Sequence, residues 1–200
     1  MKNEYRENRE DPMIIAITGT PGTGKSTVAS IMSDFYPVLH LNEIVKSEGF
    51  YSGIDEQRGS LEVEMEALEV YLQNLIASSH DLIIEGHIAH LLQIDYDMVI
   101  VLRCMPSILY DRLRAKGFNE DKIRENIEAE ALDLILVEAL EGGFKAVYEV
   151  NTTEQDANSV AACIKEIIEG NVEAYRVGGV DWSYELQQIA DGSFWRDRCL

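Results

Sequence analysis

The feature that most constrains this chain is the segment at residues 19–27, which reads GTPGTGKST. It fits G-x-x-x-x-G-K-[ST], the pattern of a loop whose backbone N–H groups surround an anionic phosphate. An apolar run at residues 13–18 predicts a buried strand before the loop, and helically spaced apolar residues at 25–35 predict a helix after it. This order places the phosphate at the positive end of the helix dipole. We therefore expect a nucleoside triphosphate to bind here; a chance likeness in a glycine-rich turn is the alternative, and both flanks argue against it.

Two residues at the end of this loop have specific predicted roles. Lys25 is expected to reach the β- and γ-phosphates of ATP, and the hydroxyl of Ser26 to hold Mg²⁺. The pattern predicts ATP and Mg²⁺ as bound molecules, but it does not separate a kinase from an ATPase or a GTPase.

Length and composition indicate a single soluble domain. The chain has 200 residues, 46% of them hydrophobic, and no apolar run approaches the roughly 20 residues that cross a bilayer. The first twelve residues are polar and charged, which argues against a signal peptide. Cys104, Cys163 and Cys199 are scattered and odd in number, as expected of free thiols in a reducing compartment. A cytoplasmic location is predicted, without membrane association.

The net charge is −19, from 36 acidic and 17 basic residues. Such a surface repels the nucleic-acid backbone, so direct sequence-specific nucleic-acid binding is not expected. It would attract a basic protein, for example a ribosomal protein. Alternatively, the acidity only keeps the protein soluble or reflects a salty cytoplasm.

The remaining chain alternates strand and helix patterns. Residues 1–12 are expected to form a disordered tail, residues 13–170 the domain, and residues 171–200 a C-terminal extension. Strands are predicted at residues 13–18, 38–41, 81–85, 98–103 and 147–151. Helices are predicted at 25–35, at 43–48 after an Asn42 cap, from a Ser60 cap to Ile76, at 106–116, at 119–140 with a buried second half, and at 153–169; residues 49–59 are predicted to be a loop. The fold class is therefore α/β, a three-layer P-loop NTPase fold with a five-stranded parallel sheet.

The end of the third predicted strand carries Glu85 and His87. An acid at this position meets the Mg²⁺ shell in P-loop proteins, usually as Asp, so Glu85 is a candidate metal residue; a solvated strand end is the alternative. His87 could contact the γ-phosphate or orient a water, and a structural role is equally open. We interpret His40, His80 and His90 as incidental.

Basic residues gather at the predicted helix after the fourth strand. Arg112 and Lys116 are four residues apart and share one helix face, next to a Gly117 hinge. This arrangement is similar to a short lid, at about residues 115–125, that closes cations over transferring phosphates. Surface charge is the alternative, above all for Arg114, Lys122 and Arg124. Arg103 ends a strand and is interpreted as a partner for a nearby carboxylate.

An acceptor monophosphate is expected to bind at about residues 42–65, where Lys46 and Arg58 are the cations. Either could hold the phosphate, and ordinary surface charge is the alternative.

Four stretches together resemble one family: GTPGTGKST, NEIVKSEG, IIEGH and LYDRLRAKGFNEDKIRENIEAE. They are similar to adenylate kinase isoenzyme six and its archaeal relatives, which in eukaryotes include the coilin-interacting nuclear ATPase and a small-subunit ribosome maturation factor. The resemblance covers residues 13–170. It implies a nucleoside monophosphate kinase with a short lid and a broad acceptor range that also hydrolyses ATP. It further implies late maturation of the small ribosomal subunit precursor through a uS11-type ribosomal protein.

The resemblance also implies site residues by position. ATP contacts fall on Gly22, Thr23, Gly24, Lys25, Ser26, Thr27 and Lys116, and on Asn151 and Thr152 at the adenine edge. Lys116 stands where relatives usually have arginine, so a bidentate phosphate contact is absent here. The Asp-x-His of the family becomes Glu85-x-His87, and Lys46 stands where arginine is frequent.

The sequence thus predicts Mg²⁺-dependent transfer of the ATP γ-phosphoryl to AMP or another nucleoside monophosphate, with Lys25, His87 and Arg112 as catalytic residues. An ATPase assembly factor is the second hypothesis, and a kinase for a small metabolite such as a sugar or shikimate is the third. Trp182, Phe194 and Trp195 in the extension either dock on the body of the protein or bind a partner.

Overall fold

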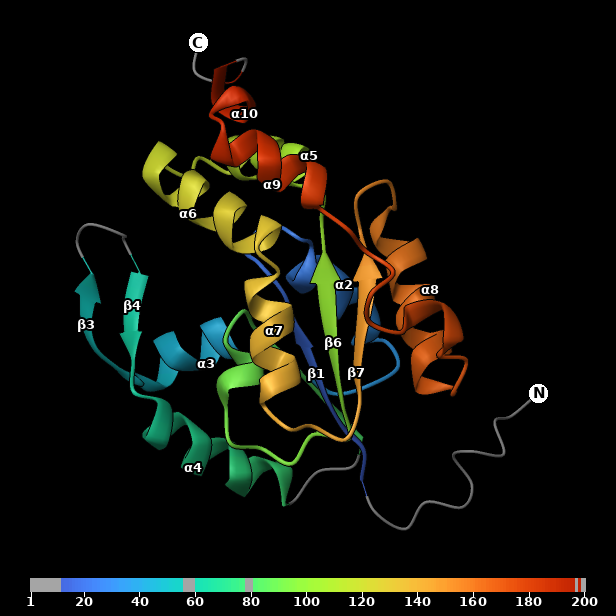
Figure 1. Ribbon diagram of the computed structural model, residues 1–200. Coiled ribbons are helices and arrows are strands. Elements are labelled where there is room, and N and C mark those ends of the chain that lie inside the picture. The colour runs from blue at the N-terminus through green and yellow to red at the C-terminus, as the bar shows by residue number, and fades with distance from the viewer. Residues whose placement is uncertain (1–11, 56–59, 78–80, 197, 199–200) are drawn as a thin grey trace.

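A five-stranded parallel sheet forms the centre of the protein (Figure 1). The computed structural model describes residues 12–55, 60–77, 81–196 and 198. The sheet consists of β1 (Ile14–Thr18), β2 (Val38–His40), β5 (Leu82–Glu85), β6 (Met98–Arg103) and β7 (Val147–Asn151), in the order β2-β5-β1-β6-β7. The predicted parallel sheet of five strands is confirmed.

Apolar side chains on both faces of the sheet explain why helices cover it on two sides. Ile14 and Ala16 of β1 belong to one buried cluster, and Ile15 and Ile17 to another. The first face packs against α7 (Leu134–Glu141) and, toward the β2 edge, against α3 (Leu41–Glu48) and α4 (Met65–Ile76). The second face packs against α2 (Lys25–Met32) and α8 (Ala157–Ile168). The predicted three-layer arrangement is confirmed.

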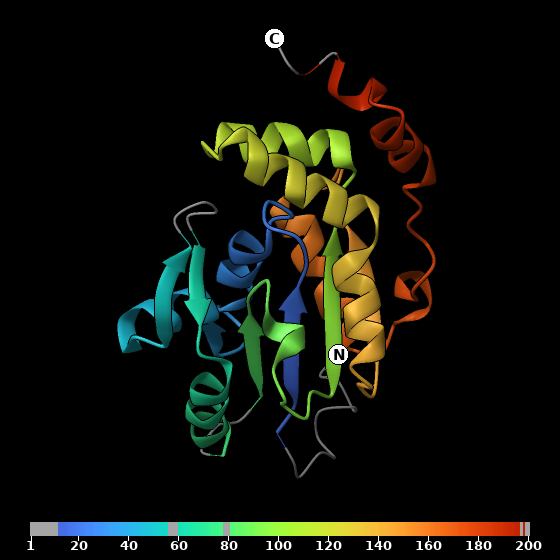
Figure 2. The ribbon, with the colours of Figure 1, turned by 60° about the vertical axis from the view of Figure 1, so that its left-hand side comes forward.

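Two helices lie across the carboxyl ends of the strands, as Figure 2 shows. These are α5 (Pro106–Ala115) and α6 (Glu120–Ala131), and the predicted lid at residues 115–125 comprises the end of α5, the turn after it and the first half of α6. The short 3₁₀ helices η1 (Ala89–Leu91) and η2 (Glu173–Tyr175) precede β6 and the C-terminal helices, respectively. The last helices, α9 (Ser183–Ala190) and α10 (Ser193–Arg196), pack beside α5 and α6.

The aromatic residues of the C-terminal extension dock on the protein's own body. Phe194 and Trp195 are buried in one cluster with Tyr110, Ile123 and other residues of α5 and α6. Arg124 lies over the Trp195 ring, 4.4 Å from the ring centroid to its guanidinium carbon. Of the two hypotheses for these aromatic residues, docking on the body of the protein is confirmed.

The chain between α3 and α4 differs from the predicted loop and capped helix. It forms an antiparallel hairpin of β3 (Tyr51–Asp55) and β4 (Ser60–Val63), and α4 begins only at Met65. Leu61 and Val63 pack against the core from the strand, so the residues predicted to form one helix, 60–76, form a strand and a helix. The predicted Ser60 cap is therefore wrong, and Arg58 and His80 lie outside the described residues.

The helix predicted over residues 119–140 is two helices. Asn119 caps the first of them, since its side chain accepts from Lys122 N, but α6 ends at Ala131 and Asp133 has a φ of 56°. Asp tolerates this left-handed conformation better than most residues. The backbone of Asp133 therefore interrupts the helix, and its carboxylate accepts from Arg103. The second half was expected to be buried, but four apolar residues there are exposed: Leu132, Leu134, Val137 and Leu140.

Smaller corrections concern helix ends. The first helix stops at Met32, three residues early. His40, not Asn42, precedes α3, so Asn42 lies in its first turn. The last body helix begins at Ala157 because the Asp156 carboxylate caps it by accepting from Ser159 N at 2.8 Å.

Within the part of the chain that the structure describes, none of the helices has the length and apolar character that crossing a membrane requires.

Candidate active site

The loop between β1 and α2 has a backbone that favours glycine at three positions, Gly19, Gly22 and Gly24. Gly19 has a φ of 136°, and a Cβ there would lie 2.3 Å from the carbonyl oxygen of Leu102. Gly24 has a φ of 102° and is the residue before α2. These glycines therefore let the loop turn tightly beneath the first backbone N–H groups of the helix, the arrangement that suits an anion.

Lys25 lies inside this loop. Its ammonium donates to the carbonyl oxygens of Gly19 at 2.7 Å and Thr20 at 3.1 Å. The pKa of Lys25 is lowered to about 8, mainly because the ammonium is buried; Lys116 adds to this effect, whereas Glu85 and Glu130 oppose it. The buried ammonium contacts only neutral carbonyl oxygens here. A bound phosphate would place negative charge beside it and so stabilise its charged form.

Ser26 and Glu85 are brought together as predicted. Ser26 Oγ donates to Glu85 Oε1 at 3.2 Å, and the Glu85 side chain is buried, with the residue 2% exposed. His40 Nδ1 lies 2.9 Å from the other carboxylate oxygen. A hydroxyl beside a carboxylate fits Mg²⁺, which prefers oxygen ligands and takes further ones from phosphates and water. Across the described ranges no three His, Cys, Asp or Glu side chains form a cage for a metal, so such an ion would depend on the nucleotide.

His40 is a site residue that sequence reasoning treated as incidental. It ends β2, and the parallel register places it directly beside Glu85 at the end of β5. The signal was its position at a strand end, because carboxyl ends of parallel strands share one edge of the sheet. The strand was predicted to end one residue later, at Leu41, so His40 was not recognised as its last residue.

His87 lies near the phosphate loop in a neutral state. Its pKa is lowered to about 4, mainly by burial and in part by the positive charge of Lys25. The ring is therefore uncharged at neutral pH and can accept or donate a hydrogen bond, but it brings no positive charge to a phosphate.

His90 has a structural role beneath the site. Its Nδ1 lies 2.9 Å from Thr18 Oγ1, and its Nε2 lies 2.9 Å from a Glu138 carboxylate oxygen. A carboxylate cannot donate, so Nε2 carries the proton and Nδ1 accepts from the threonine hydroxyl. His90 thus ties β1 to α7.

A pocket of about 380 Å³ opens beside the loop. It is lined by residues of the loop and α2, by α5, and by the segment after β7: Gly22, Thr23, Gly24, Thr27, Val28, Arg112, Ala115, Lys116, Thr152, Gln155, Ala157 and Val160. Its size and mixed lining are typical of a small-ligand site. The structure therefore brings together most of the predicted ATP residues, including Arg112 and Lys116 from one helix face.

Arg112 is held by the opposite wall of this pocket. Its guanidinium donates to Thr152 Oγ1 at 3.1 Å, to Thr152 O at 2.8 Å and to Thr153 O at 3.3 Å. The Thr152 hydroxyl also lies 3.0 Å from Thr23 O. Arg112 therefore joins α5 to the P-loop through Thr152.

Asn151 is not among the residues that line the pocket, although it was expected at the adenine edge. Its side-chain oxygen accepts instead from Thr153 N at 3.0 Å and Thr153 Oγ1 at 2.5 Å. Gln155 lines the pocket in its place, with Nε2 donating to the Asn151 carbonyl at 2.7 Å. Sequence reasoning missed Gln155 because the predicted helix began before it.

The acceptor residues are less closely placed. Lys46 is exposed on α3 and is not part of the pocket lining. The hairpin β3–β4 and α3 stand at the β2 edge of the molecule, apart from β7 (Figure 1). The described part of the expected acceptor segment, residues 42–55 and 60–65, therefore packs on the β2 side of the core and away from the pocket.

Arg103 has the carboxylate partners that its position at a strand end predicted. Its guanidinium contacts Glu130 at 2.9 Å and Glu149 at 3.2 Å, and it also contacts Asp133. Burial would lower the pKa of Arg103, but the carboxylates of Glu130 and Asp133 outweigh it and raise the pKa.

The chain matches a known family over more than half its length. A family model described as "AAA domain" matches residues 15–133. The protein named "Putative adenylate kinase" from Natronomonas pharaonis is 45% identical over 175 residues, covering 87% of this chain and 100% of that protein. The protein of the same name from Archaeoglobus fulgidus is 42% identical over 179 residues, covering 88% of this chain and 94% of its own length.

Solved structures show the same fold at low identity. Shikimate kinase from Acinetobacter baumannii, in complex with shikimate, superposes with a TM-score of 0.57 at 21% identity, covering 81% of this chain and 96% of that one. At this identity the likeness concerns the fold, and the relatives above carry the family assignment. The chain therefore belongs to the AAA-domain family and to the family of archaeal proteins named "Putative adenylate kinase".

Proposed function

We propose that this protein transfers the γ-phosphoryl group of ATP to a nucleoside monophosphate, with AMP as the first candidate, and that it also hydrolyses ATP slowly. The observation that carries the proposal is the meeting of Lys25, Ser26 and Glu85 at the carboxyl ends of β1 and β5. The name of the relatives, from Natronomonas pharaonis and Archaeoglobus fulgidus among others, supports the choice of a nucleoside monophosphate as acceptor.

The residues around the loop have separate roles in this proposal. Lys25 leaves the carbonyls of Gly19 and Thr20 and donates to the β- and γ-phosphate oxygens. Lys116 approaches from α5 and neutralises charge on the transferring group. Arg112 keeps α5 against Thr152 and is available to a phosphate oxygen if those bonds exchange.

Ser26 and Glu85 would hold Mg²⁺ and its waters, with His40 orienting the carboxylate. The bound ion supplies positive charge to the phosphate oxygens. No strong general base is needed for this chemistry, because phosphoryl transfer depends on in-line positioning and charge neutralisation.

The two walls of the pocket suit the base and ribose of ATP. Val28, Ala157 and Val160 supply apolar surface, and Thr152 and Gln155 supply polar groups at its edge. Asn151 is proposed to act only indirectly, through its carbonyl contact with Gln155. Lys46, and Arg58 outside the described residues, are the proposed contacts of the acceptor phosphate.

An acceptor screen tests this proposal. ATP and Mg²⁺ are supplied with AMP, other nucleoside monophosphates, shikimate or a sugar, and product diphosphates are separated by chromatography. Turnover that needs a nucleoside monophosphate is expected, with Lys25→Ala as the inactive control. Turnover with shikimate or a sugar alone would overturn the choice of acceptor.

A second function has an observation of its own. The protein carries a net charge of −19, and α7 with its preceding turn exposes Leu132, Leu134, Val137 and Leu140. A basic partner with an apolar patch suits such a surface, which supports an ATPase assembly factor acting on the small ribosomal subunit precursor with a uS11-type ribosomal protein. ATP hydrolysis without acceptor, increased by that protein, would support it; no increase would argue against it.

A further inference from the structure

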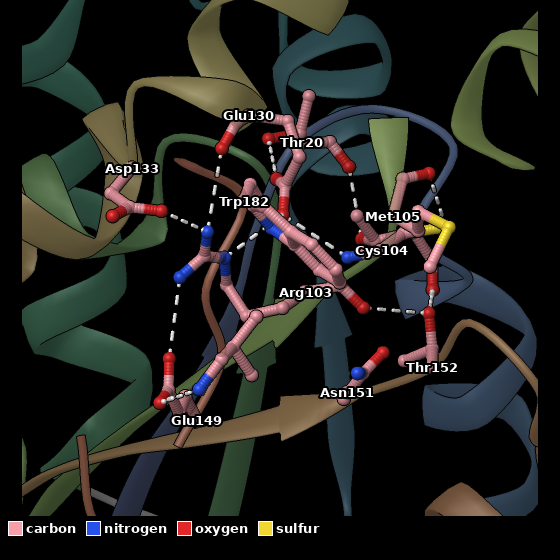
Figure 3. Close-up of polar contacts among 12 residues, drawn as sticks. Thr20, Arg103, Cys104, Met105, Glu130, Asp133, Glu149, Asn151, Thr152 and Trp182 are labelled. Atoms are coloured by element: carbon pink, nitrogen blue, oxygen red, sulfur yellow. Dashed lines mark hydrogen bonds and ion pairs between the residues drawn. The ribbon is translucent and has the colours of Figure 1, made fainter. Parts of the chain in front are cut away.

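Glu130, near the end of α6, is a buried carboxylate that joins three separate parts of the chain (Figure 3). Its Oε2 accepts from the hydroxyl of Thr20 at 2.5 Å. Its Oε1 accepts from Arg103 Nε at 2.9 Å and from the indole nitrogen of Trp182 at 3.2 Å. The P-loop, β6 and the C-terminal extension therefore share one carboxylate, which is 3% exposed.

Thr20 connects this carboxylate to the phosphate-binding lysine. The Thr20 carbonyl accepts from Lys25 Nζ at 3.1 Å and from Thr23 Oγ1 at 2.9 Å. Thr20 therefore contacts Lys25 and Thr23 of the loop through its carbonyl, and Glu130 of α6 through its hydroxyl. A change in the position of Glu130 would be transmitted directly to the backbone that surrounds the phosphate.

The C-terminal extension is fixed to the same network at a second point. One oxygen of Glu149 accepts three consecutive backbone N–H groups, from Gly178 at 2.8 Å, Gly179 at 2.7 Å and Val180 at 3.0 Å. The other oxygen contacts Arg103 at 3.2 Å. These three hydrogen bonds fix the backbone just before Trp182. The position of the indole beside Glu130 is therefore well defined.

Four donors converge on the Glu130 carboxylate, three of them on Oε1 and one, the Thr20 hydroxyl, on Oε2. A carboxylate offers about four lone-pair positions, and the donors are Thr20 Oγ1, Arg103 Nε, Trp182 Nε1 and the backbone N of Cys104, the last at 3.1 Å. A carboxylate held by four donors from three elements has one orientation. Loss of one donor allows it to rotate, and the bond to Thr20 is then no longer fixed.

We propose that Trp182 is a positioning residue for ATP binding, which acts through Glu130 and Thr20 to hold the P-loop in the geometry that receives phosphate. The C-terminal extension is thereby part of the ATP site, although it does not line the pocket. The inference rests on the proposed function, because it takes the loop to bind ATP. The gain for ATP is preorganisation: a loop already held in place loses less entropy on binding.

The test is the dissociation constant for Mg²⁺–ATP, measured by calorimetry at 25 °C on the full chain. Trp182→Phe keeps an aromatic ring and removes the indole N–H, and we expect it to weaken ATP binding about fivefold to tenfold, in the range of one ordinary hydrogen bond. Tyr184→Phe is the matched control, since Tyr184 is an exposed aromatic in the first turn of α9, two residues after Trp182. It should leave the constant unchanged.

A second pair of variants tests the loop end of the same connection. Thr20→Ser keeps the hydroxyl and should bind ATP like the parent, whereas Thr20→Val removes it and should weaken binding like Trp182→Phe. In the Thr20→Val background, Trp182→Phe should add less than about twofold, because the connection is already broken. A role in packing alone would give additive losses of stability and no change in ATP affinity.

Thermal melting of each variant separates folding from positioning. If Trp182→Phe melts above 40 °C and binds ATP within twofold of the parent, the proposal is wrong. If that variant does not fold, equal constants for Thr20→Ser and Thr20→Val overturn the proposal, and a selective loss in Thr20→Val supports it. If the unmodified protein binds no ATP, the proposed function is wrong as well as this inference. If the unmodified protein binds ATP and the variants bind it equally well, only this inference is wrong.

Discussion

Ser26 Oγ and Glu85 Oε1 lie 3.2 Å apart, so the first turn of α2 and the end of β5 meet where we propose that Mg²⁺ binds. Glu85→Gln keeps the shape of the side chain but removes its charge. We expect the Mg²⁺ concentration for half-maximal turnover to rise about 10- to 100-fold, as for residues that support a metal site. A magnesium titration at saturating ATP measures this effect. Glu169→Gln, an exposed acid at the end of α8, serves as control; an unchanged titration for Glu85→Gln would remove this carboxylate from the metal site.

His87 is expected to assist water more than the acceptor. Its neutral imidazole can orient a water toward the γ-phosphate. His87→Ala should therefore lower the rate of ATP hydrolysis at least about tenfold and lower transfer to AMP much less. Steady-state assays with and without AMP measure the two rates. An equal loss of both would contradict this role.

Lys116 is the position at which relatives usually carry arginine, according to the resemblance. A guanidinium offers two parallel donors to a phosphate, whereas an ammonium acts as a point charge. Lys116→Arg should raise kcat/KM for ATP about threefold or more, and Lys116→Met should lower it. Arg114→Lys is the control, because Arg114 is exposed on α5 and does not line the pocket. A lower value for Lys116→Arg would show that the site does not accommodate a guanidinium.

His90 predicts how stability depends on pH. Burial lowers its pKa from 6.5, Lys25 lowers it further, and the bond to Glu138 opposes both. Below about pH 6.5, His90 therefore becomes protonated in the unfolded chain but stays neutral in the folded protein. The free energy of unfolding should fall with decreasing pH, by up to about 1.4 kcal/mol per pH unit.

Urea unfolding between pH 7.5 and 5.5 measures this slope. In His90→Gln the contribution disappears, so its stability should depend less on pH than that of the parent. Identical slopes for the two proteins would contradict a lowered pKa at His90.

The sheet could be predicted because its strands are short apolar runs that need no other part of the chain to be recognised. Residues 98–103 and 147–151 were assigned with the bounds that the structure has. The P-loop was equally predictable, since its glycines, lysine and serine are adjacent in sequence.

What the sequence did not reveal depends on contacts between distant residues. His40 meets Glu85 only through the register of β2 and β5. At the break between α6 and α7, Asp133 accepts from Arg103, 30 residues away, and a helical pattern alone does not reveal this contact. Trp182 and Glu130 are 52 residues apart, so the sequence showed an aromatic residue in an extension and not its partner.

The central claim is tested most directly by the stoichiometry of turnover. ATP, Mg²⁺ and AMP are incubated with the protein, and all three adenine nucleotides are separated and quantified over time. A nucleoside monophosphate kinase forms two ADP for each AMP consumed, at a rate far above that without AMP, and Lys25→Ala should reduce this rate about 10²- to 10³-fold or more. A rate of ADP formation that is the same with and without AMP, with AMP left unconsumed, would contradict the proposed kinase activity.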